Sequence, residues 1–196
     1  MKTKLNEVVL GMTLYYQLVL NSSWVDLDTN PTWKYIGYLC YAVMIVAILN
    51  QAWKHEFTIP QMLSEAVMAA FMGVFLVIGN LSVAIVFLFG ILVTFMKPDE
   101  VLDTYLVALI TSWLTVFAAS LLDLLPLYDA ERGFWLFGFK NPNMTGYYLA
   151  VIMILLLVRN WGKVDWRIVL GLGLVGGVAV WYLQDWTALL TLLVAL

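Results

Sequence analysis

Long apolar runs broken by short polar stretches restrict the fold of this sequence more than any other feature. Hydrophobic residues make up 63% of the 196-residue chain and charged residues 12%, against about 45–50% and about 25% in soluble domains. One soluble core could not remove that much apolar surface from water. The runs also lack the two-residue alternation of a transmembrane barrel. The sequence therefore predicts an all-α, polytopic transmembrane helical bundle.

The runs predict seven full spanning helices and a partial eighth, in one transmembrane helical domain over residues 1–196. The seven cover about 5–20, 33–51, 60–78, 81–96, 101–125, 142–158 and 167–183. The third and fourth would form one helix about 55 Å long, but the hydrocarbon core is only about 30 Å thick. Gly79-Asn80 therefore predicts a turn between them. The last run, 186–196, is about half of a crossing, so we expect a chain truncated at its C-terminus.

The distribution of lysine and arginine predicts the orientation. With a cytoplasmic N-terminus, only Lys34, Arg132 and Lys140 of the ten basic residues fall on the outer side. Cytoplasmic loops carry an excess of lysine and arginine, so this topology is the favoured one. It places the longest outer loop, from about Pro126 to Asn141, outside the cytoplasm.

The charge and the few possible metal ligands argue against binding of nucleic acid, a metal ion or a cofactor. A net charge of −3 and the lack of a basic stretch give no case for nucleic acid. Cys40 is the only cysteine and lies in an apolar run, and His55 is the only histidine. We therefore expect neither a metal site nor a cofactor.

Three acidic residues, Glu65, Asp103 and Asp123, lie within about two turns of predicted helix ends. Side chains so placed reach the headgroup region or a neighbouring loop, so a structural role is expected for Glu65 and Asp103. No charge falls at the bilayer midplane, which counts against an ion-coupled transporter. Gly173 and Gly177 form a G-x-x-x-G pattern that indicates helix packing.

The outer loop contains the candidate site. Asn141-Pro142 predicts the start of a helix, because Asn is a favoured N-cap and Pro a favoured first residue. Such a helix directs N–H groups and its positive dipole end towards water, and Arg132 and Lys140 add cationic donors nearby. These groups suit a phosphate or pyrophosphate.

Acidic residues accompany this candidate anion site. Asp123, Asp129 and Glu131 could orient Arg132, or one of them could act as a base.

The pattern Gly138-Phe139-x-Asn141-Pro142-Asn143-x-x-Gly146, leading straight into an apolar helix, resembles the bacterial O-antigen and capsular polysaccharide polymerase and ligase family. Members commonly carry G-F-x-H-P-N-x-x-G after an outer-face arginine, placed here by Arg132. Residues 184–187, which include Asp185, occupy the place of the family's Ser-Arg-Thr-like turn.

The sequence departs from the family at three points. Asn141 replaces the motif histidine, and Trp186 replaces the later arginine. The family's second half, with a large outer loop, is absent. The chain thus resembles the N-terminal half, and a site formed by both halves would be incomplete.

The resemblance implies metal-independent, inverting glycosyl transfer on the outer face of the bacterial cytoplasmic membrane. The donor would be a polyprenyl-pyrophosphate-linked glycan and the acceptor a sugar hydroxyl. The expected catalytic residues are Arg132, Asp129 and Glu131. The expected substrate-binding residues are Lys140, Asn141, Asn143 and Asp185. Expected partners are the bilayer, the lipid-linked oligosaccharide and other polysaccharide-assembly membrane proteins.

Two alternatives stay open. The missing half and the two substituted motif positions favour a non-catalytic scaffold or lipid-glycan-binding partner. A small transporter or flippase would need a polar path through the membrane midplane, and the helices offer little beyond Thr, Ser and Gly there. An inverted repeat would have supported this alternative, and the sequence shows none.

Overall fold

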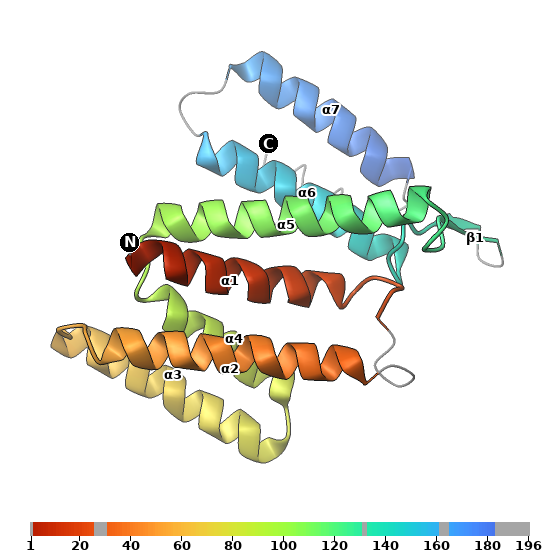
Figure 1. The fold of residues 1–196 in the computed structure, drawn as a ribbon. Helices are drawn as coiled ribbons and strands as arrows, with labels where there is room; N and C mark the ends of the chain where they lie inside the picture. Colours follow the sequence, from red (N-terminus) through yellow and green to blue (C-terminus); the bar gives the residue numbers. More distant parts are fainter. Residues whose placement is uncertain (1, 26–30, 131–132, 161–164, 183–196) are drawn as a thin grey trace. The chain divides into compact units, whose positions relative to one another are not determined.

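The computed structural model describes residues 2–25, 31–130, 133–160 and 165–182. These residues form seven helices and one two-stranded hairpin (Figure 1). In chain order they are α1 (Lys2–Val19), α2 (Thr32–Ala52), α3 (Ile59–Ile78), α4 (Leu81–Val93), α5 (Pro98–Leu121), β1 (Tyr128–Asp129), β2 (Phe134–Trp135), α6 (Pro142–Arg159) and α7 (Trp166–Tyr182). Each of the seven long apolar runs coincides with one helix, so the prediction of a helical fold is confirmed for the described residues.

Three helices of the described chain are long and apolar enough to cross a membrane: α2, α3 and α5. The prediction of seven full crossings is not supported. Helix α1 carries Lys2, Lys4 and Glu7, and α4 has 13 residues, a length of about 20 Å. Helices α6 and α7, with 18 and 17 residues, are also shorter than α2, α3 and α5. The expected eighth segment, 186–196, lies outside the described residues.

The chain divides into two compact units, Met1–Thr13 with Lys34–Thr104 and Leu14–Trp33 with Tyr105–Leu196. In the first unit, α3 and α4 pack as a helical hairpin. The predicted turn between them is confirmed. Gly79 ends α3 with a φ of 81°, and the Asn80 side chain caps α4 by accepting the Val83 N–H at 3.2 Å.

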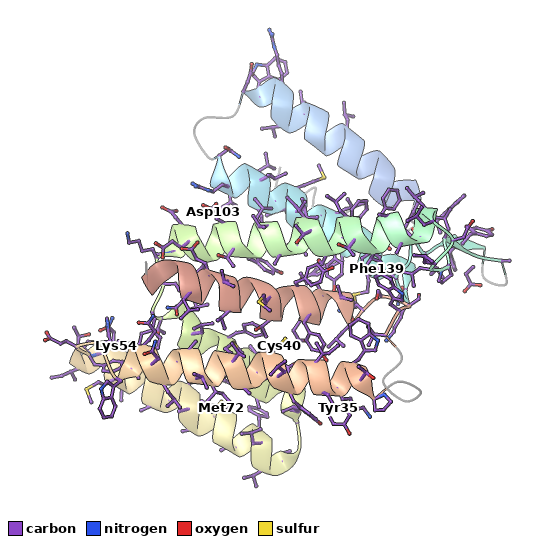
Figure 2. All side chains as sticks on the ribbon, viewed as in Figure 1. Tyr35, Cys40, Lys54, Met72, Asp103 and Phe139 are labelled. Carbon is purple, nitrogen blue, oxygen red and sulfur yellow. The ribbon has the colours of Figure 1, made fainter. Side chains whose placement is uncertain are left out.

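Polar side chains join helices within the first unit. The side chain of Asn6, which is 1% exposed on α1, accepts a hydrogen bond from the Gln51 amide on α2 at 3.2 Å. On the α3–α4 hairpin, the Thr94 hydroxyl donates to the Glu65 carboxylate at 3.0 Å. This bond fits the structural role expected for Glu65. Asp103 is half-buried near the start of α5 (Figure 2).

Helix α5 ends four residues earlier than the predicted 125, at Leu121, because the chain there closes a left-handed cap. Asp123 has a φ of 57° and is exposed. The Leu124 N–H bonds to the Ala119 carbonyl at 2.9 Å and the Asp123 N–H to the Ser120 carbonyl at 3.3 Å. This is the Schellman arrangement, and aspartate is one of the few residues other than glycine that tolerates its backbone geometry.

The core of the second unit joins the end of α1, the second half of α5, the segment after it and the start of α6. Its buried members are Leu18, Ala108, Leu109, Val116, Ala119, Leu125, Phe139 and Tyr148. Phe139, which comes from the loop before α6, lies near the end of α5 (Figure 2). The loop that holds the candidate motif is therefore part of the core.

Replacing Gln51 with Ala leaves the buried Asn6 carbonyl without this donor, and we expect a loss of about 1–3 kcal/mol in unfolding free energy. The double variant Asn6→Leu/Gln51→Leu removes both polar groups and should recover most of the loss. Chemical unfolding in detergent measures both. Equal destabilisation by the single and double variants would contradict the pairing.

Candidate functional site

The residues between α5 and α6 form a hairpin followed by a loop. Strands β1 and β2 pair antiparallel, with Tyr128 opposite Trp135. The Gly133 N–H donates to the Asp129 carbonyl at 2.8 Å, and the hairpin closes further where Leu136 and Phe137 both donate to the Leu127 carbonyl. The candidate residue Asp129 thus lies in β1, where it is half-buried.

The loop that carries the motif, residues 136–141 (the motif loop), pairs with the chain just beyond α1. The Ser23 N–H donates to the Gly138 carbonyl at 2.8 Å, and the Lys140 N–H donates to the Asn21 carbonyl at 3.1 Å. Between these bonds, Ser22 lies opposite Phe139 as an antiparallel bridge. The motif loop is therefore held by backbone hydrogen bonds to a segment more than a hundred residues earlier.

The first two motif residues have structural roles. Gly138 has a φ of 84°, and a Cβ built on it would lie 2.8 Å from the Val116 carbonyl oxygen of α5. Only glycine fits such a close backbone approach at a positive φ. Phe139 is 1% exposed and packs edge-on against Tyr148 of α6, with ring centroids 5.4 Å apart. These residues attach the motif loop to α5 and α6.

Side chains add two further ties to α6. The buried Thr145 hydroxyl donates to the Leu136 carbonyl at 2.9 Å. The Asn21 amide donates to the Tyr148 hydroxyl at 2.7 Å. The start of α6 is thereby fixed both to the motif loop and to the end of α1.

Three residues around the start of α6 are exposed to solvent. Lys140, Asn141 and Asn143 are all exposed. Asn141 is the N-cap of α6, as predicted, and its side chain accepts the Asn143 N–H at 2.9 Å. Pro142 has no N–H, and the Met144 N–H bonds to the Asn141 carbonyl at 3.1 Å. The described N–H groups are thus used within the cap, so an anion at this end would depend on the helix dipole and on side chains.

Lys140 is also partly committed to the fold. Its ammonium group donates to the Leu20 carbonyl, one residue beyond α1, at 3.2 Å. A cation at this position is favourable because helix C-termini carry partial negative charge and unpaired carbonyls. An ammonium has three donors, and this bond uses one of them.

The structure brings three of the seven expected site residues, Lys140, Asn141 and Asn143, to the start of α6, and it places Asp129 in the hairpin. Glu131, Arg132 and Asp185 lie outside the described residues. Sequence reasoning missed Asn21, Ser22 and Ser23, which hold the motif loop. Their signal is modest, since three polar residues after an apolar run also occur in ordinary loops.

Within the described ranges, no three His, Cys, Asp or Glu side chains are close enough to hold a metal ion. His55 instead makes edge contacts with the rings of Phe57 and Phe95, at centroid distances of 5.2 and 5.7 Å. The described part of the site thus offers hydrogen-bond donors and acceptors, a cation and a helix dipole.

Comparisons with known protein families, with characterised proteins and with solved structures give no match. The resemblance to the polysaccharide polymerase and ligase family therefore stays a prediction from the motif residues.

Gly138→Ala should destabilise the protein by at least about 2 kcal/mol, because its Cβ meets the α5 backbone and its φ is left-handed. Gly73→Ala is the matched control. No atom lies within 4 Å of a Cβ built on Gly73 in α3. The higher helix propensity of alanine should therefore raise stability by up to about 1 kcal/mol. Thermal unfolding of both variants measures the contrast. Similar melting temperatures would contradict the close approach.

Proposed function

We propose that this chain is a polysaccharide polymerase- or ligase-like membrane protein that binds a polyprenyl-pyrophosphate-linked glycan at the outer face of the bacterial cytoplasmic membrane. The observation that carries the proposal is the division of the motif into two halves. Gly138, Phe139, Thr145 and Gly146 are buried, whereas Lys140, Asn141 and Asn143 are exposed. Buried contacts hold a polar surface in one geometry, as a recognition site requires.

The residue roles follow from the chemistry of the donor. Cationic and dipolar groups must stabilise the charge of the departing pyrophosphate, and a base must accept the proton of the attacking hydroxyl. In this proposal Arg132 binds the pyrophosphate, assisted by Lys140 and the dipole of α6. Asp129 or Glu131 acts as the base or holds the arginine, and Asp185 binds substrate.

The proposal includes a topology. Seven helices cross the bilayer, the N-terminus is cytoplasmic, and the hairpin and motif loop face outward. This arrangement rests on the distribution of lysine and arginine. It places the polar surface where a lipid-linked glycan is presented. Other polysaccharide-assembly membrane proteins are the proposed partners.

A non-catalytic glycan-binding protein is the second candidate. This candidate is favoured because two residues of the motif loop already make hydrogen bonds within the fold. Asn141, at the family's histidine position, is a neutral amide engaged in the cap, and the Lys140 ammonium bonds to Leu20. An amide is a poor proton acceptor, so this position offers binding without acid–base chemistry.

Binding of a polyprenyl pyrophosphate to the full chain in nanodiscs tests the proposal, with the uncharged polyprenol as the comparison ligand. We expect at least tenfold tighter binding of the pyrophosphate. Arg132→Ala should remove most of that difference, because it loses a charge-assisted, bidentate donor. Equal affinity for the two ligands, or an unchanged Arg132→Ala variant, would contradict the anion site.

A matched pair at the N-cap separates binding from folding. Asn141→Asp keeps a capping oxygen and adds negative charge, so it should weaken pyrophosphate binding without lowering the melting temperature. Asn141→Ala should instead lower stability by about 1 kcal/mol.

Turnover of a lipid-linked glycan by the wild-type chain would decide for the catalytic form, and binding without turnover for the second candidate.

A further inference from the structure

One face of α5 is exposed along the part of the helix that belongs to the second unit. Val107, Leu114 and Leu121 are 60%, 51% and 57% exposed, and Thr111 and Ala118, between them, are also exposed. The spacing of four and three residues places all five on one stripe of the helix. Because α5 is long and apolar enough to span a membrane, this stripe is suited to lipid contact.

The apolar exposure continues past the end of the helix. Leu122 and Leu124 are 70% and 61% exposed, and Tyr128 of β1 is 46% exposed. Between the two leucines, Asp123 forms the helix cap described above and is itself exposed. Several large apolar side chains exposed close together in the sequence indicate a contact with a membrane or with another protein.

A row of aromatic rings in contact with one another attaches the hairpin to α5. Trp113 stacks on Phe117 at 5.0 Å, Phe117 contacts Phe137 at 5.6 Å, and Phe137 stacks on Trp135 at 5.7 Å. Tyr128 completes the row with a contact to Trp135 at 5.2 Å. The row therefore runs from the middle of α5 to both strands of the hairpin.

The backbone at Phe137 shows how firmly this row is held. Phe137 has a φ of 48°, a conformation that costs about 1–3 kcal/mol in a bulky residue and persists only where the surroundings enforce it. At the other end of the row, the indole N–H of Trp113 is buried without a partner among the described residues. Trp113 thus contributes by ring packing.

We propose that Leu122, Leu124, Tyr128 and Trp135, named here the interfacial anchor, lie in the phospholipid headgroup layer as a continuation of the lipid-facing stripe of α5. Tyrosine and tryptophan concentrate in that layer because each combines an apolar ring with a polar group. None of the four residues is charged. The proposal stands independently of the glycan-binding function, since it concerns only where the hairpin lies.

The bilayer, and not a second copy of the chain, is the occupant that this surface fits. The interfacial anchor is continuous with a stripe on a helix of spanning length. It also combines aliphatic residues next to the helix end with aromatic residues farther along, which matches the passage from acyl chains to headgroups.

Spin-label depth measurements test the proposal on the full chain. Because Cys40 is the only cysteine, Cys40→Ala gives a background for single labels at Leu114, Leu122, Leu124 and Asn143. The chain is reconstituted in vesicles of phosphatidylcholine and phosphatidylglycerol, and collision rates with oxygen and with a water-soluble nickel chelate are compared. Circular dichroism and gel filtration confirm that each labelled chain folds.

We expect the oxygen-to-nickel collision ratio to be highest at Leu114, lowest at Asn143, and at Leu122 and Leu124 several-fold above that at Asn143. Ratios at the two leucines equal to that at Asn143 would place the interfacial anchor in water and overturn the proposal. Protection of both leucines from both reagents would show that protein covers them, and would overturn it as well.

A second experiment leaves the anchor unlabelled. A label at the exposed Ala130, beside β1, reports the depth of the hairpin. Leu122→Gln/Leu124→Gln should raise its nickel collision rate several-fold. The matched control is Val77→Gln/Ile78→Gln, which changes two exposed apolar residues of α3 and should have no effect. An unchanged rate in the leucine variant would also overturn the proposal.

Discussion

The backbone pairing between residues 21–23 and the motif loop is the interaction on which the second unit depends. Ser23 and Lys140 each donate an N–H across it, and the bridge at Ser22 lies between them. Backbone N–H and C=O groups that are buried in a protein core have no water to bond, so they must find partners in the protein. The pairing satisfies that need for two segments at once. It also brings Phe139 into the core, where α1, α5 and α6 meet.

The helices could be predicted from the sequence because their signals are local. Apolar runs, Gly79-Asn80 and Asn141-Pro142 mark where helices start and stop within a few residues. The contacts of the site could not be predicted in this way. The Lys140 ammonium meets Leu20, and Asn21 meets Tyr148, across more than a hundred residues of chain. A single sequence contains the chemistry of these side chains but no indication of their partners.

The number of free N–H donors at the start of α6 was overestimated for a different, local reason. The sequence predicted a capped helix, and the cap is present, but a cap works by using the N–H groups that a bound anion would need. Two unusual backbone conformations were also unpredictable from the sequence. Asp123 and Phe137 adopt a positive φ although neither is a glycine. Both lie where the chain turns between α5 and α6. Asp123 belongs to the local cap of α5, and Phe137 is held by ring contacts with Phe117 and Trp135.

The two attachments of Lys140 have a mechanical consequence. Its backbone N–H is bound to Asn21 and its ammonium to Leu20, while the next residue, Asn141, caps α6. The residues just beyond α1 and the first turn of α6 are thereby joined through the adjacent residues Lys140 and Asn141. A sliding movement of α1 along its axis would pass directly to the polar surface at the start of α6.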